Sequence, residues 1–187
     1  MSGAKALLLI DIQTGFDAPV WGPRNNPGAE AAAGRLLADW RARDWPVVHV
    51  RHVSSQPGSP LTEARGGIAF KPEVAPEAGE TVLEKSVNSA FIGTDLEARL
   101  RAAGVADVVI AGLTTPHCVS TTARMAANLG FGVTVVHDAC AAFASNADMG
   151  WLPGAETLDA EAVHRTALAH LHGEFAQVVG VSAVLAA

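Results

Sequence analysis

The sequence predicts an α/β fold of three layers, α-β-α, in which helices cover both faces of a mostly parallel sheet of about six strands. Short apolar runs alternate along the chain with segments of helical periodicity, which is the pattern of repeated strand–helix units. Several of these runs are continuous and β-branched, as in strands that are buried on both faces. Of the 187 residues, 49% are hydrophobic and 17% are charged, so we expect a large core and a single domain over residues 1–187.

Six apolar runs are predicted to form the strands. They cover residues 6–10, 46–50, 81–84, 105–113, 133–136 and 175–179. The strand signal is weakest in the third run, because this run contains a charged residue, Glu84. The fourth and fifth runs are β-branched and continuous, as expected for strands that are buried on both faces.

Four segments between these runs have helical periodicity, which completes a Rossmann-like alternation of strands and helices. They cover residues 29–40, 94–103, 119–129 and 159–172. Pro27 suits the first turn of the first helix. Thr94 and Glu97 have the spacing of a capping box at the start of the second helix, and Gly104 provides its C-terminal stop.

Three segments are too long to be simple turns, namely residues 17–28, 54–79 and 144–154. Long loops in compact α/β domains often line binding sites. We therefore expect these loops to border the functional site; whether the loop at 54–79 closes over that site is not indicated by the sequence.

Charge and composition exclude several classes of protein. The 13 Lys and Arg residues against 19 Asp and Glu residues give a net charge of −6, so a nucleic-acid partner is not expected. No run approaches the roughly 20 apolar residues of a membrane span, and the apolar run near the start reads as a strand rather than a signal peptide. Two cysteines cannot form a disulfide scaffold, so a cytoplasmic protein with reduced thiols is predicted.

Two charged residues stand at the ends of predicted strands, where open α/β sheets bind their ligands. Asp11 ends the first run, where partial desolvation would raise the pKa of its carboxyl unless a cation lies near. It is a candidate general base, and the alternative is a simple turn cap. Lys85 follows the third run and is a candidate for that cation, with an exposed surface lysine as the alternative.

Cys118 is the strongest single candidate, because it lies between the fourth strand and the following helix. The free N–H groups of a helix N-terminus can lower the pKa of a thiol and can stabilise an oxyanion. The alternative is a buried and inert cysteine. That interpretation suits Cys140 better, which we place four residues after the fifth strand.

The seven histidines do not form a metal-binding pattern. His49 and His52 lie three residues apart on a strand and should face opposite sides, and His164, His170 and His172 read as surface or helix-end residues. The sequence contains no HExxH, paired CxxC, GxGxxG or P-loop motif. Neither a metal nor another cofactor is therefore predicted, although His117, beside Cys118, is a candidate for contact with substrate.

Three segments together resemble the isochorismatase-like cysteine hydrolases. They read LLLIDIQ at residues 7–13, SAF and GTDL after Lys85, and GLTTPHCVSTTARMA at residues 112–126. The resemblance extends from about residue 4 to residue 179, with the motifs in the family's order and spacing.

The resemblance implies a catalytic triad of Asp11, Lys85 and Cys118. It also implies a non-proline cis peptide before Thr114 and an oxyanion hole formed by the backbone N–H groups of Thr114 and Cys118. The cysteine would attack a carbonyl carbon to give a thioacyl enzyme. Four residues adjacent to the motifs are candidates for the wall of the substrate pocket: Phe16, Trp21, Phe91 and His117.

Two departures from related enzymes narrow the expected reaction. Zinc-dependent nicotinamidases of this superfamily carry an Asp-x-His motif after the second strand, whereas residues 49–52 here read HVRH. Members that hydrolyse the vinyl ether of isochorismate can function without the cysteine, so Cys118 favours hydrolysis of a carbon–nitrogen bond in a small amide or ureide. A vinyl ether hydrolase and a non-catalytic, flavodoxin-like binding module remain the alternatives. The family resemblance also implies a homodimer or homotetramer.

Overall fold

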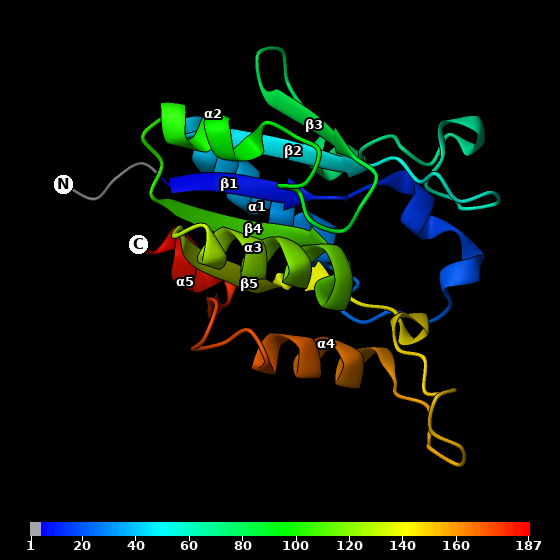
Figure 1. Cartoon of the computed structure of the whole chain (residues 1–187). Coiled ribbons are helices and arrows are strands. Elements are labelled where there is room, and N and C mark those ends of the chain that lie inside the picture. Colours follow the sequence, from blue (N-terminus) through cyan, green and yellow to red (C-terminus); the bar gives the residue numbers. More distant parts are fainter. Residues whose placement is uncertain (1–4) are drawn as a thin grey trace.

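The computed structural model describes residues 5–187 and shows a six-stranded parallel sheet between layers of helices (Figure 1). The strands are β1 (Lys5–Ile10), β2 (Val47–His52), β3 (Thr81–Lys85), β4 (Asp107–Leu113), β5 (Gly132–Ala141) and β6 (Gln177–Val179). They lie in the order β3-β2-β1-β4-β5-β6, with every neighbouring pair parallel. This is the strand order of Rossmann folds, so the predicted fold class is confirmed.

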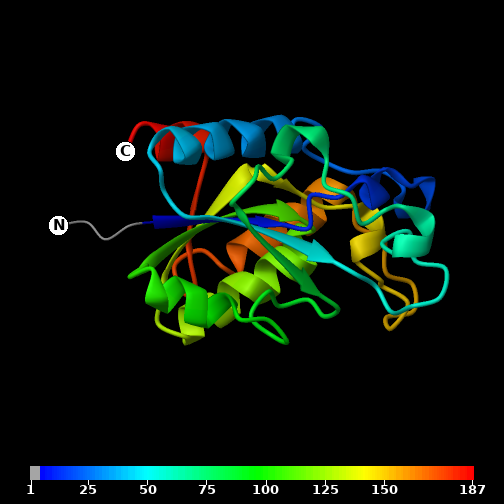
Figure 2. The ribbon, with the colours of Figure 1, turned by 90° about the horizontal axis from the view of Figure 1, so that it is seen from above.

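The helices divide between the two faces of the sheet (Figure 2). They are α1 (Ala29–Ala42), α2 (Leu96–Ala102), α3 (Ser120–Asn128), α4 (Ala160–Ala169) and α5 (Val181–Leu185). Leu7 and Leu9 of β1 pack with α1 and α5 on one face, whereas Leu8 and Ile10 pack with α2 and α3 on the other. Successive residues of β1 thus face the two cores in alternation, which explains why its sequence is continuously apolar. Within residues 5–187, no helix has the length and apolar character needed to cross a bilayer.

The reversal of strand order between β1 and β4 sets the position of the site. From β1 the chain passes to β2 on one side, and β4 later pairs with β1 on the other side. The carboxyl ends of β1 and β4 therefore adjoin, and ligands of open α/β sheets bind at such a point. The long loops near residues 20, 60 and 148 gather at this end of the sheet in both views (Figures 1 and 2).

The structure corrects the predicted extent of several strands and adds a helix. β2 runs two residues further, to His52, and β4 begins two residues later, at Asp107. β5 continues to Ala141 after a register shift opposite Ile110 and Gly112, so Cys140 lies within the strand rather than after it. β6 begins at Gln177, two residues later than predicted. Helix α5 was not predicted, because five residues are too few to show a helical period.

The predicted details at two helix starts were also wrong. Pro27 lies outside α1, which begins at Ala29 after Gly28. The capping box of α2 is absent, because the helix begins at Leu96 rather than directly after Thr94. The Thr94 hydroxyl instead accepts a hydrogen bond from the Leu96 N–H (3.3 Å) and donates one to the Ala90 carbonyl (2.6 Å).

Gly112 occupies the irregularity in β4 where that strand meets the end of β1. Its φ of 143° suits glycine, and a Cβ atom there would lie 2.0 Å from the carbonyl oxygen of Ile10. Neither backbone can move without disturbing the sheet centre, so we expect Gly112→Ala to lower the free energy of unfolding by at least about 3 kcal/mol. Chemical denaturation measures this.

Gly28→Ala is the matched control for that substitution. Gly28 has a φ of −95°, and a Cβ atom at this position would have no neighbouring atom within 4 Å. We therefore expect Gly28→Ala to change the free energy of unfolding by less than about 1 kcal/mol. Equal stabilities of the two variants would contradict the packing argument at Gly112.

Candidate active site

Three strand ends bring Asp11, Lys85 and Cys118 together at the carboxyl edge of the sheet. The Lys85 Nζ atom lies 2.5 Å from Asp11 Oδ2 and 3.3 Å from Cys118 Sγ. Asp11 follows β1, Lys85 is the last residue of β3, and Cys118 follows β4. All three side chains are buried. The interpretations of Asp11 as a turn cap and of Lys85 as a surface residue are therefore wrong.

Asp11 is held in an unusual backbone conformation at the end of β1. Its φ is 53°, which is uncommon for a residue other than glycine, and its N–H donates to the Val50 carbonyl at 2.8 Å. Burial raises the pKa of Asp11, and the Lys85 ammonium only partly offsets this effect. Within the described residues, Asp11 Oδ1 has no hydrogen-bond partner, so this oxygen is free to accept a proton.

The Lys85 ammonium has three acceptors, and the third was not expected from the sequence. Besides Asp11 and Cys118, the Nδ1 atom of His52 lies 3.3 Å from Lys85 Nζ. His52 and Lys85 are register partners in β2 and β3, which places their side chains beside each other. Burial and the Lys85 charge lower the pKa of His52 to about 4, so its ring is neutral at pH 7 and Nδ1 can accept.

Gln13 fixes the position of His52 through its main chain. The Gln13 Oε1 atom accepts from the His52 N–H at 2.7 Å, and Gln13 Nε2 donates to the His52 carbonyl at 3.0 Å. The Gln13 side chain is fully buried. From the sequence, His52 was weighed only as a metal ligand, and no local pattern indicated that it would adjoin a lysine 33 residues away.

Cys118 lies in a π-helical turn, Thr115–Val119, that leads directly into α3. Burial and the Asp11 charge raise the pKa of the Cys118 thiol, which corrects the expectation that the helix N-terminus would lower it. The thiol therefore carries its proton in this arrangement and also donates weakly to Asn88 Oδ1 at 3.8 Å. A nearby base is needed to make it a nucleophile.

The turn that carries Cys118 is anchored from α4. The Thr115 hydroxyl lies 2.8 Å from His164 Nδ1, and both side chains are buried. His164 was predicted as a surface or helix-end residue, and this prediction was wrong because α4 packs directly against the turn. The peptide bond between Leu113 and Thr114 is cis, as the family resemblance implied.

A cavity of about 410 Å³ opens onto the Cys118 sulfur. Phe16, Trp21 and His117 line it, as predicted, with Phe16 and Trp21 5.2 Å apart between ring centroids. Each of the three long loops contributes to the wall, including the first part of the loop at 54–79. Phe91 does not line the cavity, because it stacks on Phe131 within the core below.

The donor atoms of Asp11, His52 and Cys118 all lie within 4.8 Å of one another and resemble a set of metal ligands. The Lys85 ammonium occupies the same space, since it is within 3.3 Å of a donor atom from each of these residues. A metal cation would have to displace this buried ammonium or be repelled by it. The side chains therefore fit an ammonium better than a metal ion.

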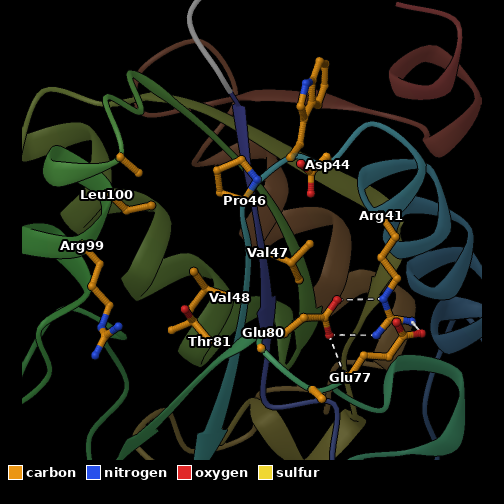
Figure 3. Close-up of a pocket in the computed structure, with 14 residues that line it drawn as sticks. Arg41, Asp44, Pro46, Val47, Val48, Glu77, Glu80, Thr81, Arg99 and Leu100 are labelled. Carbon is orange, nitrogen blue, oxygen red and sulfur yellow. Dashed lines mark hydrogen bonds and ion pairs between the residues drawn. The ribbon is translucent and has the colours of Figure 1, made fainter.

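A larger cavity, about 560 Å³, lies at the opposite edge of the sheet, where β2 and β3 begin (Figure 3). Its central charged group, Arg41, is paired with Glu77 and Glu80. Glu80 accepts from Arg41 Nε at 2.7 Å and from Arg41 Nη2 at 2.8 Å, and buried His49 lies 2.8 Å from the same carboxylate. Among the described residues that line this cavity there is no cysteine.

The Glu80 cluster predicts a pH dependence of stability. The Arg41 hydrogen bonds lower the pKa of Glu80 to about 2 from an ordinary value of 4.5. The ionised carboxylate thus contributes stability above pH 4.5, and this contribution disappears as the pH falls towards 2. We expect Glu80→Gln to lower the free energy of unfolding at pH 7 by about 1–2 kcal/mol, with the difference from wild type shrinking below pH 4.5.

Denaturation curves at several pH values measure this difference. Glu63→Gln is the control, because Glu63 is exposed and makes no ion pair among residues 5–187. A constant difference between Glu80→Gln and wild type from pH 7 to pH 3 would contradict the assignment.

Comparisons with known proteins agree with this geometry. Residues 5–183 match the family model described as the isochorismatase domain. The chain is 43% identical over 180 residues to the uncharacterised isochorismatase family protein YrdC of Bacillus subtilis, covering 96% of this chain and 93% of that protein. It is 36% identical over 151 residues to a maleamate amidohydrolase of Pseudomonas putida, covering 71% of this chain and 70% of that protein.

A solved structure shares the whole fold. It is a protein from Chromobacterium violaceum described as a hydrolase of the isochorismatase family, with a TM-score of 0.91 and 48% sequence identity. The match covers 98% of this chain and 92% of that one. The family model, the identity to YrdC and this structural match lead to the same conclusion: the chain belongs to the isochorismatase family and is a hydrolase.

Proposed function

We propose that the protein is a metal-independent cysteine hydrolase that cleaves a carbon–nitrogen bond in a small amide or ureide. The observation that carries this proposal is the buried contact of Lys85 with both Asp11 and Cys118, beside an open cavity. A carboxylate with a raised pKa, a fixed cation and a thiol are the groups needed for nucleophilic attack on a carbonyl.

In the first half of the proposed reaction, Asp11 accepts the thiol proton and the Cys118 sulfur attacks the carbonyl carbon of the substrate. The raised pKa of Asp11 makes this transfer easier, because it brings the acid and the base closer in proton affinity. The Lys85 ammonium balances the negative charge that Asp11 carries before the proton transfer and that Cys118 carries after it. Backbone N–H groups of Thr114 and Cys118 stabilise the oxyanion.

Collapse of the tetrahedral intermediate breaks the carbon–nitrogen bond, and the proton on Asp11 passes to the departing ammonia or amine. The product of this half-reaction is a thioester on Cys118. In the second half, Asp11 accepts a proton from water, the resulting hydroxide attacks the thioester, and the carboxylic acid product leaves. The thiol regains its proton from Asp11, so the enzyme returns to its starting state.

The name of one relative supports this reaction over the alternatives. The Pseudomonas putida protein is a maleamate amidohydrolase, whose reaction is the cleavage of an amide. A vinyl ether hydrolase would not require Cys118, and a non-catalytic module would require none of the three residues. Assembly of the chain as a dimer or tetramer stays a prediction.

Ammonia release tests the proposal directly. The purified protein is offered a panel of small amides and ureides in the presence of a chelator, with Cys118→Ala measured beside it. We expect release from at least one compound, insensitivity to the chelator, and loss in the variant. Release that survives in Cys118→Ala, or that the chelator abolishes, would contradict the proposal.

A further inference from the structure

We propose that the cavity selects substrates that are uncharged near the reacting carbonyl, an inference that rests on the proposed cysteine hydrolase function. The observation behind it is the chemistry of the cavity wall. The wall combines two aromatic rings with neutral polar groups, which are Ser54, Ser55, Gln56, Ser59, Ser86, Asn88 and Asn146. In the described part of the chain, no Lys, Arg, Asp or Glu lines this cavity.

The two histidines of the wall are also neutral at pH 7. Burial lowers the pKa of both His52 and His117, and the Lys85 charge lowers that of His52 further. The charge of Lys85 itself is balanced by Asp11 at 2.5 Å. The catalytic cluster therefore offers no net positive charge to a substrate carboxylate.

The basic residues near this edge of the sheet are occupied elsewhere. Lys71 lies 2.6 Å from Asp17 and 2.9 Å from Glu30, and Arg24 lies 2.7 Å from Glu30. Arg51 pairs with Glu84. Arg65 lines a separate cavity beside Pro60 and Val20.

The lack of an available cation on the wall disfavours a bound carboxylate. A carboxylate that enters the cavity would lose part of its hydration without gaining a cation in return. Hydroxyl and amide groups can instead replace the water around an uncharged amide or ureide. The Phe16 and Trp21 rings can cover an apolar or planar face of the same molecule.

Alkylation of Cys118 by two matched reagents tests the inference without a known substrate. Iodoacetamide and iodoacetate have nearly the same size and differ in charge, and mass spectrometry of peptides separates reaction at Cys118 from reaction at buried Cys140. Glutathione is the reference thiol, because its sulfur is free in solution. At pH 7.5 we expect the rate with iodoacetamide divided by the rate with iodoacetate to be at least tenfold larger at Cys118 than at glutathione. A ratio equal to or below that of glutathione would overturn the inference.

A charge placed on the cavity rim provides the second measurement. Gln56→Arg should lower this rate ratio at least threefold, because it supplies the missing cation. Gln177→Arg makes the same charge change at an exposed position of β6, away from the cavity wall, and should not lower the ratio. An equal effect of both substitutions would mean that net charge, rather than the cavity, governs reagent choice, and would overturn the inference.

The outcomes separate this inference from the function on which it rests. If neither reagent modifies Cys118, the proposed nucleophile fails and the inference fails with it. If Cys118-dependent ammonia release is faster from maleamate, an anion, than from the uncharged maleamide, the cysteine hydrolase function stands and the selectivity is overturned. Faster release from maleamide would support both.

Discussion

Replacing Cys118 by alanine should lower kcat/KM for ammonia release by at least about 10⁴-fold, because no other group can form the covalent intermediate. Cys118 is 8% exposed at the base of the cavity, and within the described chain its sulfur makes hydrogen bonds with Lys85 and Asn88. Its loss should leave packing nearly unchanged. We therefore expect the thermal unfolding midpoint of Cys118→Ala to stay within a few degrees of wild type.

Cys140→Ala is the matched control, because the two cysteines are both buried and differ in their surroundings. Cys140 is fully buried within β5, opposite Gly112, and contacts neither Asp11 nor Lys85. Its replacement should lower the free energy of unfolding by about 1–2 kcal/mol through a small cavity and should preserve ammonia release. If Cys140→Ala lost activity while Cys118→Ala kept it, the assignment of the nucleophile would be wrong.

Asp11→Asn should impair both the reaction and the fold. The amide cannot accept the thiol proton, so we expect kcat/KM to fall by about 10³-fold or more. The substitution also leaves the Lys85 ammonium buried without its anion, and removing one partner of a buried ion pair costs about 3–5 kcal/mol of stability. Steady-state kinetics and chemical denaturation measure the two effects separately.

A second substitution tests whether the stability loss has this cause. In the double variant Asp11→Asn/Lys85→Met, no buried charge is left unpaired, so much of the lost stability should return while activity stays absent. Asp17→Asn is the control, because the Asp17 side chain is 64% exposed and its partner Lys71 keeps a second anion, Glu30, at 2.9 Å. It should cost less than about 1 kcal/mol. A double variant no more stable than Asp11→Asn would argue against the unpaired charge.

Much of the architecture could be predicted from the sequence because its signals are local. The runs that became β1, β2 and β4 are apolar on both faces, and the helices on either side carry periodic apolar residues that fill the two cores. The errors lie where local signals compete or are short. The end of β5, the start of α2 and the five-residue α5 depend on partners elsewhere in the chain.

From the sequence alone, Asp11, Lys85 and Cys118 were candidates because each ends or follows a predicted strand, and the family resemblance implied that the three form one triad. This was possible because the carboxyl ends of parallel strands lie at one edge of a sheet, so a strand–helix alternation already places the residues that follow the strands on the same side. Three other features emerge only from the folded molecule. Phe91 turns into the core, His164 anchors the catalytic turn, and His52 completes the contacts of Lys85.

The folded molecule is also needed to see that burial raises rather than lowers the pKa of the Cys118 thiol. Burial, pKa and side-chain contact depend on what the rest of the chain packs around a residue. Asp11 and Lys85 are 74 residues apart in sequence and 2.5 Å apart in space. Such a distance depends on how side chains pack in both cores, and a local sequence pattern contains no information about that packing.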